Sequence, residues 1–172
     1  MDKTKIIITR EEIAKRVAEL ASEISRDYKD KNPLLIGVLK GSFVFMSDLI
    51  RSMNIPVEID FIRLSSYRAC IETSGKIRVL KKLETPIKGR HVLVVEDIVD
   101  SGLTVSFLLD CLKRRKPASV KLCALFDKPS RRKIEVPIDY VGFTVPDSFV
   151  VGYGLDLDEK FRHLPDLCIL EE

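Results

Sequence analysis

The stretch His91-Val-Leu-Val-Val-Glu-Asp-Ile-Val-Asp-Ser-Gly-Leu-Thr104 decides the fold. It begins with the apolar run Val92 to Val95, which is typical of a strand buried on both faces in a parallel sheet. Its last four residues are a small-residue turn, and apolar residues at helical spacing follow that turn: Val105, Leu108, Leu109 and Leu112. The stretch therefore predicts a buried strand, a tight turn and a helix.

Three carboxylates, Glu96, Asp97 and Asp100, follow the predicted strand within five residues. Because like charges repel, we expect them to need water, a cation or a cationic ligand at the end of the strand. The turn 101–104 opens a helix whose first N–H groups have no partner within the helix and suit a phosphate. A ribose 5-phosphate has two ends that suit this unit: its hydroxyl groups suit the acidic side chains, and its phosphate suits the turn. An ordinary strand-to-helix connection is the alternative interpretation.

Strands and helices alternate on both sides of this unit. We expect strands at 34–39, 57–64, 77–83, 120–126 and 138–145, and a helix at 10–29 that begins with a capping box of Thr9 and Glu12. A second helix follows Lys40-Gly41-Ser42, with an expected buried face of Phe43, Met46, Leu49 and Ile50. This alternation predicts a parallel α/β sheet.

Composition places the chain among soluble globular proteins, since 45% of its 172 residues are hydrophobic and 32% are charged. The net charge of +3 is too small to indicate a nucleic-acid partner. Two basic clusters, 113–116 and 131–133, are interpreted as solvated surface. No apolar run approaches membrane-spanning length, and the N-terminus lacks the layout of a signal peptide. Scattered cysteines at 70, 111, 123 and 168 indicate reduced thiols, so we expect a cytoplasmic protein.

The order Glu96-Asp97-x-x-Asp100-Ser101-Gly102-x-Thr104, after four apolar residues, resembles the phosphoribosyl pyrophosphate signature of type I phosphoribosyltransferases. It has the form found in the hypoxanthine-guanine phosphoribosyltransferases, and it is not a Walker loop because no Gly-Lys-Ser/Thr follows. The resemblance implies a purine salvage enzyme that transfers 5-phosphoribose from phosphoribosyl pyrophosphate to N9 of hypoxanthine or guanine. The products would be IMP or GMP and pyrophosphate. The implied fold is a Rossmann-like, twisted, mainly parallel sheet of about five strands flanked by helices, with a small hood.

The resemblance gives the central stretch its roles. Asp100 would accept the purine N7 proton as general base, and Glu96 and Asp97 would engage the ribose hydroxyls and, through water, magnesium. The cofactor is expected to be Mg2+, because the ligands are hard oxygens and the substrate carries a pyrophosphate. The 5-phosphate would lie on the loop of Ser101, Gly102, Leu103 and Thr104, with Glu96, Asp97 and Asp100 completing the phosphoribosyl site.

Further motifs complete the implied site. Leu39-Lys40-Gly41, with an implied non-proline cis peptide, would bind the pyrophosphate together with Ser66, Tyr67 and Arg162. Gly41 would let backbone N–H groups approach this anion, although the motif taken alone is interpreted as an ordinary turn. Lys128 would donate to the purine 6-oxo group, Phe149 would stack on the base, the backbone of Val150 would read its edge, and Asp156 would lie near a second metal ion. Without the resemblance, Lys128 would be an exposed loop lysine, and Phe149 and Val150 would be core residues.

Residues 65–76 lack periodicity and lie between two predicted strands, so we expect a mobile lid over the substrate. Arg68-Ala69-Cys70-Ile71-Glu72 departs from the small residues that are common there in the family. We expect a single domain over 1–172, with a core at about 30–145 and a hood formed by the N-terminal segment and about 146–172. The resemblance also implies a homodimer or homotetramer.

Two other functions stay open at the level of sequence. The chain could be a regulatory protein that keeps this fold and binds RNA or DNA, or an enzyme that uses adenine, uracil or xanthine. Asp100, Lys128 and Phe149 argue against the regulator, as does the lack of a dominant basic surface.

Overall fold

A six-stranded sheet forms the centre of the computed structural model, which describes residues 4–65 and 77–171. The strand order is β4-β3-β2-β5-β6-β7, and the five strands from β3 to β7 in this order are parallel. β4 pairs antiparallel with β3 at one edge. The strands are β2 (Leu34–Leu39), β3 (Glu58–Ser65), β4 (Arg78–Lys81), β5 (His91–Val99), β6 (Ser119–Asp127) and β7 (Tyr140–Thr144). The predicted mainly parallel α/β sheet is confirmed, with β4 as an antiparallel sixth strand.

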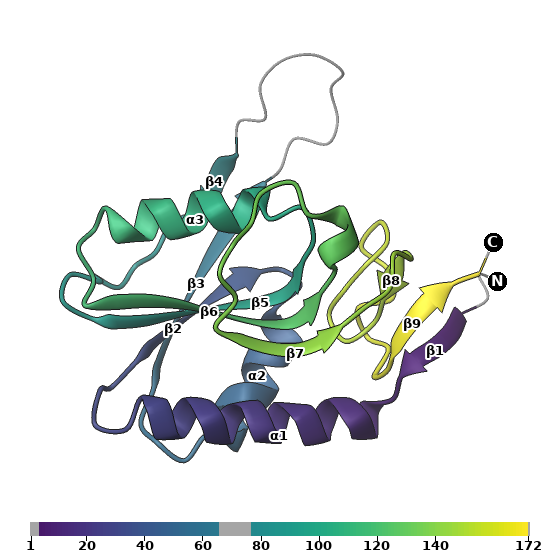
Figure 1. Ribbon diagram of the computed structural model, residues 1–172, viewed down its shortest axis with the longest axis horizontal. Helices are drawn as coiled ribbons and strands as arrows, with labels where there is room; N and C mark the ends of the chain where they lie inside the picture. The colour runs from purple at the N-terminus through teal and green to yellow at the C-terminus, as the bar shows by residue number, and fades with distance from the viewer. Residues whose placement is uncertain (1–3, 66–76, 172) are drawn as a thin grey trace.

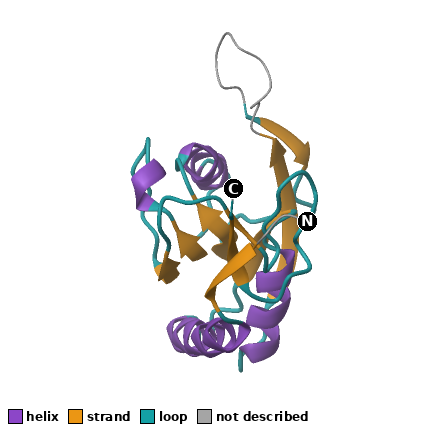
Figure 2. Ribbon diagram, turned by 90° about the vertical axis from the view of Figure 1, so that its right-hand side faces the viewer, coloured by secondary structure: helices purple, strands orange, loops and turns teal. Residues whose placement is uncertain are grey.

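Helices cover both faces of this sheet. α1 (Arg10–Asp27) and α2 (Phe43–Ser52) lie on one face and α3 (Leu103–Lys113) lies on the other (Figures 1 and 2). α1 begins with the predicted capping box, in which the Glu12 N–H donates to Thr9 Oγ1 at 3.2 Å and the Thr9 N–H donates to Glu12 Oε2 at 2.8 Å. A short 3-10 helix, η1 (Pro129–Arg131), follows β6.

The central strand β5 is buried on both faces, as its apolar run predicts. Leu93 and Val95 pack in the cluster that includes α1 and α2, whereas Val92 and Val94 pack in the cluster that includes α3. The predicted apolar face of α3 is buried in that second cluster. Parallel strands place all their carboxyl ends at one edge of the sheet, where sites of such folds form.

The predicted buried face of α2 was partly wrong. Phe43 is exposed, and the helix instead buries Phe45, Met46 and Leu49 against α1 and the sheet, with Ile50 half-buried at the margin. Phe43 is the first residue of the helix, and although it lies only three residues before the buried Met46, its side chain is 46% exposed. The apolar pattern therefore identified the helix and the contact residues Met46, Leu49 and Ile50, but it included Phe43 in place of Phe45.

A second, three-stranded antiparallel sheet joins the two ends of the chain (Figure 1). It consists of β1 (Thr4–Ile8), β9 (Leu167–Leu170) and β8 (Val150–Val151), with β9 in the middle. This pairing holds the C-terminal segment beside the main sheet. Within residues 4–65 and 77–171, no helix combines the length and the apolar character that crossing a membrane requires.

Candidate active site

Two adjoining cavities lie at the carboxyl end of β5. The larger, of about 830 Å³, is lined by Glu96, by residues 98–107 and by parts of the segment 131–134. The smaller, of about 290 Å³, is lined by Asp97, Ile98, Asp100, Lys128, Arg131, Phe149, Val150, Leu155 and Asp156. Ile98, Asp100 and Arg131 line both cavities. The fold thus brings together the residues that the sequence predicts for the phosphoribosyl and purine subsites, and it places Asp100 between them.

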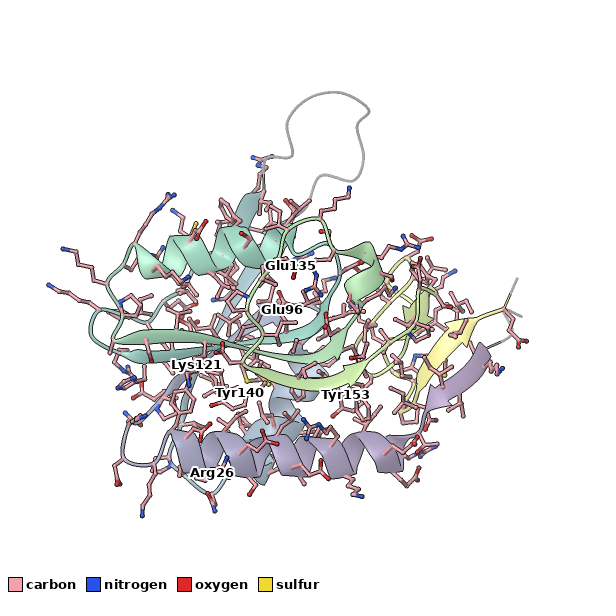
Figure 3. The ribbon with its side chains drawn as sticks, viewed as in Figure 1. Arg26, Glu96, Lys121, Glu135, Tyr140 and Tyr153 are labelled. Carbon is pink, nitrogen blue, oxygen red and sulfur yellow. The ribbon has the colours of Figure 1, made fainter. Side chains whose placement is uncertain are left out.

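The sequence predicts that Glu96 and Asp97 follow the strand. This prediction was wrong, because both residues lie within β5. β5 continues to Val99 because it stays paired with β6, with Glu96 opposite Ala124 and Val99 opposite Asp127. Glu96 is only 5% exposed and lies in the interior beneath α3 (Figure 3). Burial, and then the charge of Asp97, raise the pKa of the Glu96 carboxyl well above its ordinary value. Burial also raises the pKa of Asp97, although the Ile98 N–H, which donates to Asp97 Oδ1 at 2.8 Å, opposes this rise.

The raised pKa of Glu96 predicts a pH-dependent stability. The folded state holds this proton more tightly than the unfolded chain, so Glu96 favours folding most below its ordinary pKa, and this contribution is lost as the pH rises through the raised value. Glu96→Gln cannot ionise. Its melting temperature, relative to the unmodified protein, should therefore increase as the pH rises from the ordinary carboxyl pKa of 4.5 through the neutral range.

Thermal melts across that pH range check this prediction, with Glu135→Gln as the matched control because Glu135 is exposed (Figure 3). A difference in melting temperature that is the same at every pH would contradict the assigned burial of the Glu96 charge.

The carboxylates of this site could bind a magnesium ion together with the phosphate groups of a substrate. Among the described residues, no group of three or more His, Cys, Asp or Glu side chains could hold a metal ion. Asp97 and Asp156 line the same cavity, but Asp156 is paired with Arg162 at 3.1 Å. Mg2+ is usually bound by one or two carboxylates together with substrate phosphates and water. The donor set therefore suits an ion that arrives with a pyrophosphate rather than a resident metal.

The turn before α3 depends on a glycine. Gly102 is the N-cap of α3 and has a φ of 83°, in the left-handed region that favours glycine. A Cβ there would also lie 2.4 Å from the carbonyl oxygen of Ile134, which no side chain tolerates. The turn opens α3 toward the larger cavity, where Ser101, Gly102, Leu103 and Thr104 all form part of the lining. The unpaired N–H groups of a helix start suit a phosphate at this position.

The loop after β2 packs directly on Asp97. The peptide bond between Leu39 and Lys40 is cis, as the resemblance implies. A Cβ on Gly41 would lie 1.7 Å from Asp97 Oδ2, so only a glycine allows this close approach. The carbonyl oxygen of Gly41 in turn lies against Gly154, where a Cβ would lie 2.3 Å from it.

The basic residues expected at the pyrophosphate meet around one carboxylate. Glu159 accepts from Lys40 Nζ at 2.7 Å and is paired with Arg162 at 3.4 Å. Arg162 also donates to the carbonyl oxygen of Gly154 at 2.8 Å. Two cations of this kind can bind a diphosphate. Ser66 and Tyr67, and the expected lid except for Ser65, lie outside the described residues.

Lys128 is not the exposed lysine that its loop position alone predicts. It is 6% exposed, and its Nζ donates to the carbonyl oxygen of Ser148 at 2.7 Å, in the segment that leads to Phe149. Phe149 is 48% exposed although it lines the smaller cavity, whereas Val150 is buried in β8. A buried cation beside a free aromatic face suits a flat, polar heterocycle.

Arg132 is not the solvated surface residue that its basic cluster, 131–133, predicts. The Arg132 side chain is 9% exposed, is paired with Asp127, and donates from Nε to the carbonyl oxygen of Asp100 at 3.1 Å. No periodicity marks this residue. The sequence feature that could have indicated its burial is Asp127, an acidic residue at the carboxyl end of the preceding strand, β6.

The chain is similar to known proteins over nearly its whole length. Residues 4–158 match the family model described as phosphoribosyl transferase domain. A hypoxanthine-guanine phosphoribosyltransferase of Bacillus subtilis is 48% identical over 170 residues, which cover 99% of this chain and 94% of that protein. A crystal structure of a hypoxanthine-guanine phosphoribosyltransferase from Bacillus anthracis superposes with a TM-score of 0.93 at 47% identity, covering 99% and 100% of the two chains. The hypoxanthine phosphoribosyltransferase of Trypanosoma cruzi in complex with the product IMP superposes with a TM-score of 0.91 at 42% identity, covering 99% and 95%.

Proposed function

The chain belongs to the phosphoribosyl transferase family, and on this premise we propose that it is a purine salvage enzyme acting on hypoxanthine or guanine. It transfers the 5-phosphoribosyl group of phosphoribosyl pyrophosphate to N9 of the base, and IMP or GMP and pyrophosphate are released. The bond between ribose C1 and the pyrophosphate oxygen breaks, the bond from C1 to N9 forms, and the base loses one proton.

The observation that carries the proposal is the position of Asp100 between two cavities of different character. The larger cavity begins at the turn before α3, which suits the 5-phosphate. The smaller cavity contains Lys128, Phe149 and Val150, which suit a 6-oxopurine. A carboxylate shared by both cavities lies where the base and the ribose must meet, so Asp100 is the residue that we assign as general base.

The remaining residues of the site position the substrates and stabilise charge. Glu96 and Asp97 engage the ribose hydroxyls, and the carboxylates favour the positive charge that develops on the ribose ring. Leu39, Lys40, Gly41 and Arg162 hold the pyrophosphate, for which Glu159 must release Lys40 and Arg162. Asp97 and Asp156 would hold magnesium beside that pyrophosphate. There the ion would neutralise charge on the leaving group.

A panel of five bases tests the function. Hypoxanthine, guanine, xanthine, adenine and uracil are each incubated with the protein, phosphoribosyl pyrophosphate and magnesium, and pyrophosphate release is measured. Turnover with hypoxanthine and guanine supports the proposal, and turnover only with adenine or uracil would reassign the substrate. Absence of turnover with all five, together with salt-sensitive RNA binding, would favour a regulator on the same fold.

Lys128 is expected to select 6-oxopurines. Lys128→Ala removes the buried donor, so KM for hypoxanthine and guanine should rise about tenfold or more, the effect of one charge-assisted hydrogen bond. The difference in KM between these two bases and adenine should become smaller, because adenine has an amino group where hypoxanthine has an acceptor and so gains nothing from the Lys128 donor. Steady-state kinetics with the three bases measure both effects.

Lys113→Ala is the matched control for this prediction, because Lys113 is an exposed lysine in the last turn of α3. If Lys128→Ala leaves KM unchanged for every base, Lys128 supports the loop of Ser148 and does not contact the purine.

We also propose a cytoplasmic homodimer or homotetramer. The three cysteines that the structure describes, Cys111, Cys123 and Cys168, are free, which suits a reducing compartment. Light scattering of the purified protein measures the number of subunits directly.

A further inference from the structure

The segment 132–134 lies directly behind the turn that carries Asp100. Arg132 Nε donates to the carbonyl oxygen of Asp100 at 3.1 Å, while the N–H groups of Lys133 and Ile134 donate to the carbonyl oxygen of Ser101 at 2.8 and 3.1 Å. The carbonyl groups of two successive turn residues are therefore held from one side. The absence of a side chain at Gly102 lets Ile134 come this close.

The Arg132 guanidinium is buried with its own counter-charge. Its side chain is 9% exposed, and it is paired with Asp127, the last residue of β6, whose side chain is 19% exposed. A buried cation without a partner would be strongly destabilising, so Asp127 is what allows the arginine to occupy this position. Since Asp127 lies opposite Val99 in the parallel pair of β6 and β5, the ion pair starts from a rigid part of the sheet.

The same segment carries the lysine of the smaller cavity. The N–H of Lys128 donates to the carbonyl oxygen of Val99 at 3.0 Å, one residue before Asp100. The chain then passes through η1 and returns to the turn at Arg132. The segment 128–132 therefore contacts the strand end and the turn at both of its ends, at Val99 through Lys128 and at Asp100 through Arg132. The ion pair of Asp127 and Arg132 joins the two ends of this segment.

We propose that Arg132, held by Asp127, is a positioning residue that fixes the Asp100 carboxylate relative to the purine that Lys128 holds. This inference rests on the function proposed above. Arg132 is not among the lining residues of either cavity, and it acts through the backbone of Asp100. An arginine is required because its planar guanidinium donates in two fixed directions, from Nε to Asp100 and from a terminal nitrogen to Asp127. A lysine has one nitrogen on a flexible chain and cannot hold both acceptors in a fixed geometry.

Arg132→Ala and Arg132→Lys test this role. A misplacement of about 1 Å of a catalytic group reduces the rate by about 10²-fold, so we expect kcat to fall by about 10- to 100-fold in both variants. KM for hypoxanthine should change little, because Lys128 and Phe149 remain in place. Guanidinium ion in the millimolar range should restore part of the lost kcat in Arg132→Ala, where it can occupy the vacated site between Asp127 and Asp100.

Arg16→Ala is the matched control. Arg16 is also a partly buried arginine that donates to two carbonyl oxygens, those of Val141 and Gly142, and is paired with Glu19, but it joins α1 to β7. Its loss should lower the melting temperature while kcat stays near that of the unmodified enzyme and does not respond to guanidinium. Should Arg132→Ala fail to fold, Arg132→Lys, which keeps the charge beside Asp127, carries the test.

The outcomes separate this inference from the proposed function. If the unmodified protein releases no pyrophosphate with any base, the proposed function fails and the inference fails with it. If it is active and Arg132→Lys retains its full kcat, the positioning role is wrong and the function stands. A kcat loss in Arg16→Ala as large as that in Arg132→Ala, without guanidinium rescue in either, would also overturn the inference, because it would reflect general destabilisation.

Discussion

Asp100→Asn should lower kcat by about 10²-fold or more, the range expected for the loss of a general base. Asparagine has nearly the same shape as aspartate, and Arg132 and the segment 133–134 hold this turn through its backbone carbonyl groups. The turn should therefore keep its conformation and its affinity for phosphoribosyl pyrophosphate. What is lost is the carboxylate that lines both cavities and can accept a proton. The expected signature is a reduced kcat with almost unchanged binding of phosphoribosyl pyrophosphate.

Steady-state rates of nucleotide formation and equilibrium binding of phosphoribosyl pyrophosphate measure the two quantities separately. Asp30→Asn is the control, because Asp30 lies in the exposed loop after α1 at a φ of 60°, where asparagine is well tolerated. Turnover of Asp100→Asn close to that of the unmodified enzyme would remove Asp100 from the proton transfer.

The central strand shows what the sequence could predict and where the prediction stopped. Four apolar residues predict a strand buried on both faces, and Val92 to Val95 are buried in this way. Apolar patterning ends a predicted strand at the first charged residue, however, and β5 continues through Glu96 and Asp97. Their inclusion depends on the pairing of β5 with β6, which is a tertiary contact. Local pattern therefore located the acids but could not predict their burial.

The site was predicted as separate motifs and assembled by topology. The strands β2, β5 and β6 are parallel neighbours, so their carboxyl ends and the loops that follow meet at one edge. This rule brings Gly41, Asp97 and Lys128 into one region without any knowledge of their contacts. The contacts themselves are not visible in the sequence. Lys40 pairs with Glu159, 119 residues away, and the pair of Asp127 and Arg132 forms only because η1 turns the chain back.

Gly41→Ala should reduce kcat/KM for phosphoribosyl pyrophosphate by about 10²-fold or more, since displacements of about 1 Å have effects of that size. The new methyl group would lie 1.7 Å from Asp97 Oδ2 and 2.6 Å from Asp97 Cγ, so one of the two groups must move. The loop cannot easily retreat, because the carbonyl oxygen of Gly41 already lies against Gly154. Asp97 cannot rotate freely either, because its Oδ1 accepts from the Ile98 N–H at 2.8 Å.

Either movement disturbs a proposed substrate contact, because the loop 39–41 is assigned to the pyrophosphate and Asp97 to the ribose and magnesium. Gly89→Ala separates this collision from the general effect of a glycine substitution. Gly89 has a φ of 71° and open space around its Cα, so an alanine there strains the backbone, by about 1 kcal/mol, without meeting another atom. Gly89→Ala should therefore lower the melting temperature and leave kcat/KM unchanged, whereas Gly41→Ala should lower kcat/KM far more than its melting temperature would explain. Full activity in Gly41→Ala would mean that the loop after β2 can move away from Asp97 without disturbing the pyrophosphate, and the assigned role of Leu39, Lys40 and Gly41 would then be wrong.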